Sequence, residues 1–386
     1  MEESGDDNRA RRRALRGADR ERLLRYVASI LEHQNTPLRD VVRDRVLPRL
    51  PVQPLRRFRS VSRSWHASLS SPFFAHTQSA THRSLSGFFF FLPRCLSYYL
   101  PLDPRAGSIP DPAFFFLPDT VSVVASCNGL VACRSSIDPS RYYISNPATM
   151  DWTALPRTLP HHAAEGFAAL VFQPSALDFS ADYHLVCVCV CPSGTLSLHV
   201  FSSALSAWRP SDAAVPKARE PWSSVAVGGL ACWPNRDGSV SSYDPITDKV
   251  TVIIMPPPAL ETAGRWELAE MGGNLCCVAA KQGTVEVWSA TTTAAIGGGA
   301  TWRRLASVGM AGEPQPMASE GKEDRAVVCV GDQVVAIDVG SGEWRVVRDG
   351  LVTMGWDACV PYISSLVAVK EFCYGSGCYT CRLHCG

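Results

Sequence analysis

Apolar residues follow two different periods along this chain, and the change falls near residue 84. Before it, apolar residues recur at intervals of three and four, the spacing of helices that bury one face. After it, short runs of alternating apolar and polar residues are separated by Gly, Pro, Asn and Asp, as in strands joined by turns. The sequence therefore predicts a small all-α region followed by a larger all-β region.

An amphipathic helix is predicted between Asp19 and His33. Asp19 is a suitable N-cap, because its carboxylate can accept a bond from the free backbone N–H groups of the first turn. The apolar residues of this segment form one stripe: Leu23, Leu24, Val27, Ile30 and Leu31.

Three shorter helices are predicted to follow. Thr36-Pro37 places a capping residue before a proline at the first helical position, and the helix that begins there should end at Pro48. Leu55 and Phe58 lie three residues apart on the next helix. Ser62 caps the last one, which the proline at position 72 should stop.

The segment "YHLVCVCVCPSGTLSLHVF" is the clearest hairpin pattern in the second region. Its valines and cysteines alternate, so that Val186, Val188 and Val190 share one face and Cys187, Cys189 and Cys191 share the other. Ser193-Gly194 is suited to the turn into a second strand. The pattern indicates a β-meander.

Four segments repeat one layout: "YYISNPATMDW", "LHVFSSALSAW", "VSSYDPITDKV" and "VVAIDVGSGEW". Each strand ends at a polar residue, and an aromatic or β-branched residue stands six positions later. The polar residues are Asn146, Ser202, Asp244 and Asp338, and the later ones are Trp152, Trp208, Val250 and Trp344. Asn, Asp and Ser side chains bond readily to the backbone two residues on, so each copy predicts a turn followed by a returning strand. A fifth copy begins at Val285 and carries a Gly-rich insertion before Trp302.

These copies recur roughly every 40 to 55 residues, the spacing of four-stranded propeller blades. A β-propeller is therefore the predicted fold of the second region. Leu85 to Leu117, with "GFFFFL" and "AFFFLP", precede the first copy, and "WDACVPYISSLVAVKEF" follows the last. If both ends share one blade, the ring closes and their apolar edges are covered. Six blades are expected, with seven as the alternative.

Composition adds limits to this picture. Of the 386 residues, 46% are hydrophobic and 19% are charged, which argues against wholesale disorder. The net charge of +1 argues against a general attraction to nucleic acid or to an anionic membrane. No apolar segment typical of a secretory signal follows the start, and the longest apolar run, Phe88 to Leu92, is too short to span a bilayer. We expect a protein of the cytoplasm or nucleus whose 15 cysteines are reduced.

The first 18 residues carry a basic cluster after an acidic start. The cluster consists of Arg9, Arg11, Arg12, Arg13 and Arg16. Such a run can serve as a nuclear-import or phosphate-binding patch, but a solvated, disordered arm is the favoured interpretation of residues 1–18, because charge runs are common at termini.

Three further patterns are candidate chemical sites. The tail "CYGSGCYTCRLHC" crowds Cys373, Cys378, Cys381, His384 and Cys385 together, whereas zinc sites normally use two separated pairs, so no metal is expected. His161-His162 lacks an acidic or cysteine partner at useful spacing. Gly297 to Gly299 is not followed by Lys-Ser/Thr, so a phosphate-binding loop and a cofactor are not expected. No nucleophile elbow or metalloprotease helix is present, and catalysis is not expected.

One stretch of the helical region resembles a known module. "LPRLPVQPLRRFRSVSRSWHASLSSPFF" (Leu47 to Phe74) closely resembles the F-box, and "SCNGLVAC" and "ISNPATMDWTALP" are similar to the opening blade of plant F-box-associated, kelch-like propellers. Two departures stand out. Thr36-Pro37 replaces the Leu-Pro that usually opens the first F-box helix, and the paired glycines of kelch blades are present only at Gly228-Gly229 and Gly272-Gly273.

The resemblance implies four segments: an arm (1–18), a preceding helix (19–35), an F-box (36–80) and an F-box-associated propeller (84–386). It implies that the F-box binds a Skp-type adaptor, and through it a cullin–RING ubiquitin ligase, while the propeller binds a protein substrate. The implied adaptor-binding residues are Leu38, Val41, Val46, Leu47, Leu50, Pro51, Leu55, Phe58, Val61 and Trp65. Physical reasoning agrees, because three very short helices cannot bury so many apolar side chains among themselves.

The sequence leaves alternatives open. The ten residues could pack only against the 19–35 helix and the propeller, and the propeller could act as an interaction module outside any ligase, or as an enzyme such as a sugar oxidase. The longest connections, Pro210 to Trp222 and Pro256 to Trp266, are candidate substrate loops by their length alone. Nothing in the sequence identifies the substrate.

Overall fold

The computed structural model describes residues 38–92, 96–104, 109–158, 166–172, 182–190, 196–219, 223–255, 265–291, 301–350 and 359–370. The chain divides into two compact units, Met1–Arg49 and Leu50–Gly386, and each is described by itself. The predicted arm (1–18) and the predicted helix at 19–35 lie outside the described residues.

In the first unit, the helix predicted from Thr36 to Pro48 is a succession of three short elements: α2 (Leu38–Val41), the π-type turn η1 (Val42–Val46) and the 3-10 turn η2 (Leu47–Arg49). The backbone N–H of Leu47 donates to Val42 O, a wider spacing than in an α-helix. The expectation that Pro48 ends the helix was wrong, since Pro48 lies inside η2. Proline lacks the N–H that an α-helix would use, and a short 3-10 turn tolerates its absence.

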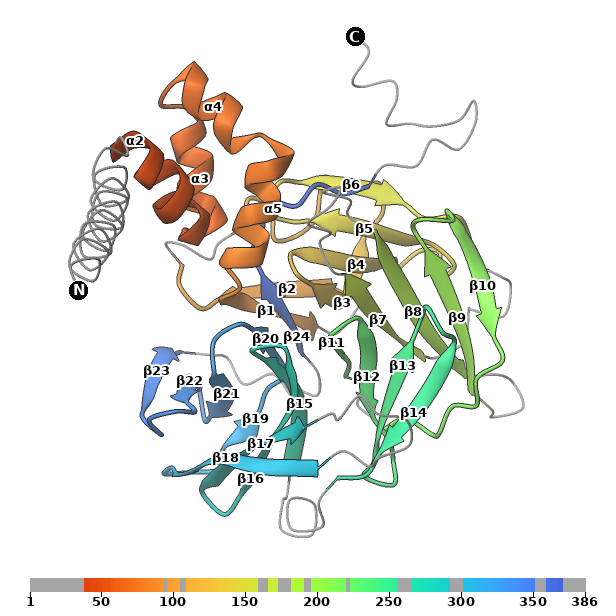
Figure 1. Cartoon of the computed structure of the whole chain (residues 1–386). Coiled ribbons are helices and arrows are strands. Elements are labelled where there is room, and N and C mark those ends of the chain that lie inside the picture. The colour runs from red at the N-terminus through yellow and green to blue at the C-terminus, as the bar shows by residue number, and fades with distance from the viewer. Residues whose placement is uncertain are drawn as a thin grey trace, which may run out of the picture. The chain divides into compact units, whose positions relative to one another are not determined.

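Three helices open the second unit: α3 (Val52–Arg59), α4 (Arg63–Leu69) and α5 (Pro72–Thr81) (Figure 1). The predicted cap of α4 is confirmed, because Ser62 Oγ accepts a bond of 3.2 Å from the backbone N–H of Trp65. Helix α5 was not predicted. Pro72 stops α4 and also occupies the start of α5, where its fixed φ suits the first turn and Ser71 Oγ caps Phe74 N at 3.2 Å.

The rest of the second unit is a six-bladed β-propeller, as predicted (Figure 1). Its first blade comprises β3 (Val121–Cys127), β4 (Leu130–Ser135), β5 (Tyr142–Asn146) and β6 (Asp151–Ala154). The second comprises β7 (Gly166–Phe172), β8 (Tyr183–Val190), β9 (Leu196–Ser202) and β10 (Ala207–Ser211). The third comprises β11 (Val225–Val227), β12 (Leu230–Pro234), β13 (Val240–Asp244) and β14 (Lys249–Ile253).

The fourth blade comprises β15 (Arg265–Met271), β16 (Asn274–Lys281), β17 (Thr284–Thr291) and β18 (Thr301–Gly309), with β20 (Ser319–Gly321) added in parallel to β15. The fifth comprises β19 (Gln315–Pro316), β21 (Arg325–Val330), β22 (Gln333–Asp338) and β23 (Trp344–Arg348). The sixth comprises β24 (Cys359–Ile363), β1 (Leu85–Leu92) and β2 (Leu96–Pro101), in this spatial order.

The two ends of the propeller sequence share the sixth blade, as predicted. Strand β1 pairs with β24 in antiparallel register, with Phe88 opposite Pro361. The "GFFFFL" run therefore closes the ring, but "AFFFLP" forms turns rather than a strand. Its Phe114 has a positive φ of 58° and only 2% exposure, and its ring lies 5.6 Å from that of Phe89. The second aromatic run thus fills the core beside the closing blade.

The repeated segments are the outer hairpins of blades one to five, joining the third strand to the fourth. The predicted turn bonds are confirmed in two copies: Asn146 Oδ1 accepts from Ala148 N at 3.0 Å, and Asp244 Oδ1 from Ile246 N at 2.8 Å. In the other two, Ser202 Oγ and Asp338 Oδ1 accept from the backbone three residues on, at Leu205 N and Ser341 N. The fourth residue after each polar residue takes a left-handed conformation in the four ungapped copies, at Met150, Ser206, Asp248 and Gly342. This shared backbone geometry explains why the same turn chemistry recurs.

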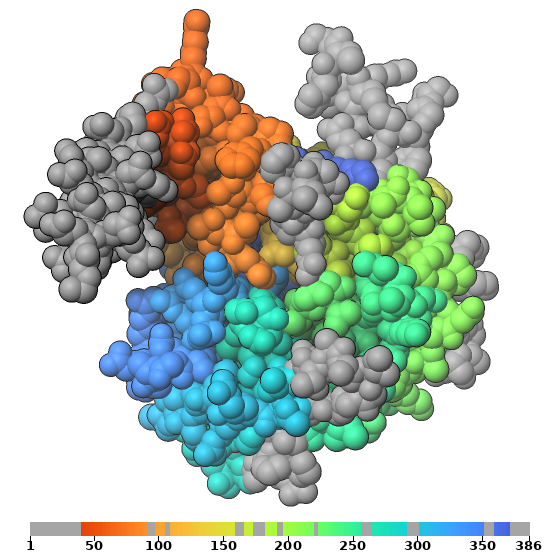
Figure 2. Space-filling model, viewed as in Figure 1, coloured from red at the N-terminus to blue at the C-terminus, as the bar shows by residue number. Residues whose placement is uncertain are grey.

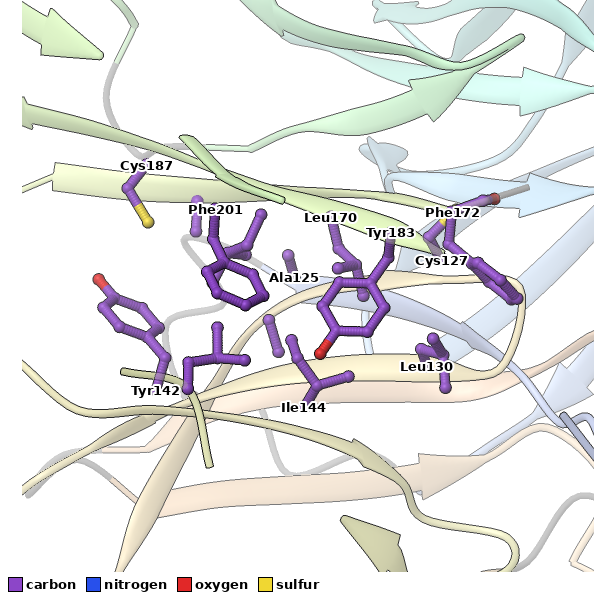
Figure 3. Packing of buried hydrophobic residues seen from close by; sticks show 14 of the residues in the cluster. Ala125, Cys127, Leu130, Tyr142, Ile144, Leu170, Phe172, Tyr183, Cys187 and Phe201 are labelled. Carbon is purple, nitrogen blue, oxygen red and sulfur yellow. The ribbon is translucent and has the colours of Figure 1, made fainter. Parts of the chain in front are cut away.

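The blades bury both of their faces. Cys187 belongs to a core between the first two blades, and Tyr142 points toward it from the first blade (Figure 3). Val186, on the other face of β8, packs in a separate core with Trp233 of the third blade. The predicted alternation is confirmed for the described part of β8, while the turn at 193–194 lies outside the described residues.

Candidate functional site

The corner between α3 and α4 exposes apolar surface that the helices do not cover. Leu55 and Leu69 are fully buried and anchor the inner side of the two helices. On the outer side, Val61 is 64% exposed, and the rings of Phe58 and Trp65 form a T-shaped pair 5.6 Å apart. Both rings are only half-buried. We call the surface formed by Phe58, Val61 and Trp65 the helical corner.

The other implied docking residues fall into distinct environments. In the first unit, Val46 is 46% exposed and Val41 half-buried, Leu47 is buried, and the side chain of Leu38 lies outside the described part. In the second unit, Leu50 and Pro51 are half-buried and Leu55 is fully buried. The structure thus brings together Phe58, Val61 and Trp65 from the implied set, and it places Leu55 in the interior.

Arginines surround the helical corner. Arg57 and Arg63 are exposed, while Arg59 is partly covered and its Nη2 donates to Leu69 O at 3.1 Å. Burial, and secondarily the charge of Arg56, lowers the pKa of Arg59. Arg56 reaches the first blade, where its Nη1 donates to Ala148 O at 3.0 Å. The corner therefore offers an apolar centre with basic edges.

Helix α5 is tied to the propeller by the buried side chain of Gln78. Its Nε2 donates to Leu50 O at 3.3 Å, and its Oε1 accepts from Leu366 N at 3.1 Å. Gln78 is fully buried, so the bond to Leu366 N is made away from water, while the bond to Leu50 O is partly buried. No sequence signal marked this residue, because its partners lie far away in the chain.

The segment 364–370 completes this connection. Asn146 Nδ2 donates to Ser365 O at 3.0 Å and to Val367 O at 2.7 Å, so the outer turn of the first blade holds the segment. A Cβ at Gly129 would lie 1.9 Å from Ser365 Oγ, which requires glycine there. The "SSLVAV" segment therefore links α5 and the first blade, and the helices of the second unit are attached at several separate points.

Three charged residues meet where the connection from α5 reaches the propeller. Glu270 accepts from Arg83 Nη2 at 3.0 Å and from the backbone N–H groups of Gly321 and Gly273 at 2.9 and 2.7 Å. Glu320, on β20, accepts from Asn128 N at 3.1 Å. Burial, and then the neighbouring Glu270, raises the pKa of Glu320 to about 7. No local sequence pattern predicts this cluster, since β20 is a three-residue strand.

The turns between the first and second strands of the blades explain where the paired glycines occur. Gly228-Gly229 and Gly272-Gly273 are the turns between the first and second strands of the third and fourth blades, and all four have positive φ. In the first blade Asn128-Gly129 takes the same place, with φ values of 48° and 93°. Asparagine tolerates the left-handed region, so this blade keeps the turn without paired glycines.

The described cysteines are free thiols, nine in number. Burial raises the pKa of Cys232 to about 11 and that of Cys133 further still, so these groups are poor nucleophiles. Within the described ranges, no group of three or more His, Cys, Asp or Glu residues is placed to hold a metal ion. The Cys-rich tail, His161-His162 and Gly297 to Gly299 lie outside the described residues.

One of the two candidate substrate loops is partly described. Arg219 stacks 4.1 Å above the ring of Trp266 and forms an ion pair of 2.9 Å with Glu267. Burial raises the pKa of Glu267, although Arg219 opposes the shift. Arg219 is thus held by the blade, while most of the Pro256 to Trp266 connection lies outside the described residues. Across the part of the chain that the structure describes, no helix has the length and hydropathy to cross a membrane.

Comparison with known proteins adds to this picture. The family model "F-box protein At3g26010-like, beta-propeller" matches residues 102–322, more than half of the chain. The Arabidopsis thaliana F-box protein At5g07610 is 28% identical over 226 residues, which cover 53% of this chain and 51% of the relative. F-box protein At5g03970 of the same plant is 26% identical over 271 residues, covering 63% of each chain. The matched region therefore spans about half to two thirds of these relatives' length.

Among solved structures, the structure of YjhT is similar with a TM-score of 0.41 and 12% identity, covering 62% of this chain and 87% of that chain. The family assignment rests on the sequence match, which begins inside the propeller and covers its first four blades. The six blades, the helices before them and the extent of this match lead to one conclusion: the chain belongs to the F-box proteins with an At3g26010-like β-propeller.

Proposed function

We propose that this protein is the substrate-recognition subunit of an SCF-type (Skp–cullin–F-box) ubiquitin ligase. In this proposal the F-box helices bind a Skp-type adaptor, and the propeller binds the protein to be ubiquitinated. The observation that carries it is the helical corner, where Phe58, Val61 and Trp65 offer an apolar surface in a protein of the F-box family. Aromatic residues of this kind dominate the energies of many interfaces.

The proposed mechanism is proximity. A receptor that holds its target beside a ubiquitin-charged enzyme raises the effective concentration of the target and contributes no chemical group. The attachments through Gln78, Arg56 and segment 364–370 support this role, because they would keep the target at a fixed distance from the adaptor. The proposed location is the cytoplasm or nucleus, where such ligases work.

The ten implied residues remain the proposed docking set, but they differ in exposure and therefore in their value as sites for test substitutions. Val61 and Trp65 can be changed with little damage to the interior, because Val61 is 64% exposed and Trp65 half-buried. Leu55 is a poor probe, since its side chain is fully buried and its loss would leave a cavity. Val46, 46% exposed in the first unit, is a second independent probe.

The test is a pull-down of a purified Skp-type adaptor by the full chain. We expect the double variant Val61→Asp/Trp65→Ala to recover about tenfold less adaptor than the wild type, because it removes an anchor and places a charge in the apolar contact. Ile246→Asp is the matched control: Ile246 is 82% exposed on an outer hairpin and should not matter. Equal recovery by wild type and double variant would reject docking and favour a propeller module that acts outside a ligase.

A further inference from the structure

Lysine and arginine are distributed unevenly along this chain. Residues 1–216 contain 23 arginines and no lysine, whereas residues 217–386 contain nine arginines and five lysines. Lysine is among the commonest residues of soluble proteins, so its absence from more than half of a chain is unusual. A general preference for arginine would act on both parts alike and does not explain the difference between them. We call residues 1–216 the lysine-free region.

The lysine-free region includes helices α3 to α5, whose outer surface Figure 2 shows in orange, and the first two blades. The fold accounts for some of its arginines: Arg56 and Arg59 donate to backbone carbonyls at 3.0 and 3.1 Å. Arg57 and Arg63 differ, since both are exposed and no hydrogen bond or ion pair among the described residues involves their side chains. Lysine and arginine have nearly the same helix propensity, so the fold does not explain arginine at these two positions.

The two side chains differ in whether they can accept ubiquitin. The neutral Nζ amine of lysine attacks the thioester carbonyl of a ubiquitin-charged enzyme and forms an amide bond. The carbon–sulfur bond breaks, the cysteine of the enzyme leaves as a thiolate, and the amine releases a proton. The guanidinium group of arginine stays protonated and is not an acceptor. Arginine therefore keeps the positive charge of a surface without offering a site for ubiquitin.

Two of the five lysines lie beside the attachments of the helices. The backbone N–H of Lys322 donates to Arg83 O at 2.8 Å, in the connection between α5 and β1, and Lys322 is exposed. Lys370 ends the segment that bonds to α5, and its Nζ forms an ion pair of 2.6 Å with Asp182. An ion pair favours the charged ammonium, which is not the nucleophile. Lys322 is therefore the natural acceptor best placed near the helices.

We propose that the ubiquitin-charged enzyme of the ligase reaches the helices and the first two blades, that lysine is excluded there to keep ubiquitin off the receptor, and that Lys322 is the remaining site of self-ubiquitination. The enzyme comes near the chain only through a docked F-box, so the proposal rests on the proposed function. A receptor exposes its own surface to the high effective concentration that it provides for its target. The other exposed lysines, Lys217, Lys249 and Lys281, lie against or in the third and fourth blades, outside this reach.

The test is a reconstituted reaction of the full chain with a Skp-type adaptor, a cullin–RING core and a ubiquitin-charged enzyme, in which mass spectrometry identifies each modified lysine. Arg157→Lys places an acceptor just after β6 of the first blade, where the side chain of Arg157 is 66% exposed. Arg303→Lys is the matched control, because Arg303 is exposed on the fourth blade, across the ring. Both changes keep the charge. We expect at least about fivefold more ubiquitin at the new amine of Arg157→Lys than at that of Arg303→Lys.

Loss of the natural acceptor gives the second measurement. Lys322→Arg should lower the self-ubiquitination of the chain at least about threefold, whereas Lys249→Arg, on the third blade, should leave it unchanged. If thermal unfolding shows that Arg157→Lys does not fold, Leu205→Lys replaces it, because Leu205 is 73% exposed on the outer hairpin of the second blade.

Equal modification of the first-blade and fourth-blade variants, or an unchanged level in Lys322→Arg, would overturn the proposal. The adaptor bound to the chain is measured in the same mixture. Absence of bound adaptor would reject the proposed function itself, whereas equal modification with adaptor bound would reject only the protective role of the lysine-free region.

Discussion

The blades and the helical corner use large apolar residues in opposite ways. Trp233 of the third blade is completely buried, and its ring meets that of Phe167 at 5.6 Å in the core between two blades. Trp65 has a comparable aromatic partner in Phe58, yet both rings stay half-exposed. A blade face is covered by the next blade of the same chain, whereas the described residues of the second unit leave Val61 64% exposed and both rings of the corner half-exposed. The difference indicates which apolar residues serve the fold and which are available to a partner.

The largest expected effect tests this contrast directly. Trp233→Ala should lower the free energy of unfolding by about 3–5 kcal/mol, because it leaves a cavity in a closely packed core. Trp65→Ala should lower it by about 1 kcal/mol in the isolated chain, since half of the side chain is already in water. Denaturant unfolding of the two variants measures both values. Equal losses would mean that the corner is part of the core.

The second prediction concerns the charged cluster and pH. The pKa of Glu320 is about 7 in the folded chain against an ordinary value of 4.5, so the folded state binds more protons between these values. The free energy of unfolding should therefore fall as the pH rises from about 4.5 to about 7, by roughly 3 kcal/mol from this group. Glu320→Gln should remove this part of the pH dependence. Unfolding curves across this range give the measurement, and an unchanged profile in the variant would contradict it.

A smaller loss of stability is expected when the contact between the first blade and segment 364–370, which holds α5, is disturbed. Gly129→Ala places a Cβ 1.9 Å from Ser365 Oγ at a φ of +93°, and it should cost about 2–3 kcal/mol through clash and strain. Gly228→Ala is the matched control, because its φ is +58° and no atom lies within 4 Å of the added Cβ. It should cost about 1 kcal/mol. Similar losses in thermal unfolding would show that the contact with segment 364–370 is unimportant.

Much of the propeller could be predicted because its signals are local. The outer hairpins repeat a polar residue such as Asn146 or Asp244 whose side chain bonds within its own turn, so a few residues specify each copy. The closing blade was also predictable, since apolar runs at both ends needed cover. The shared register of β1 and β24 confirmed that reasoning.

The attachments and the charged cluster could not be predicted from local patterns. Gln78 bonds to Leu366, and Arg83 to Glu270, across 288 and 187 positions of sequence. No sequence pattern near Gln78 or Arg83 indicates its distant partner. Helix α5 was not predicted, because a proline such as Pro72 is equally compatible with the end of one helix and with the first turn of another. Only the three-dimensional arrangement tells which side chains of α3 and α4 face inward, and so places Leu55 in the interior.

Hydrogen–deuterium exchange of the full chain, with and without a Skp-type adaptor, tests the central claim most directly. If the helical corner is a docking surface, the adaptor should slow exchange at the amides of residues 58–66 and leave the central strands of the third blade unchanged, because binding excludes water from the contacted helices. The Val61→Asp/Trp65→Ala variant should lose this protection. Unchanged exchange at residues 58–66 in a mixture that contains excess adaptor would contradict the account.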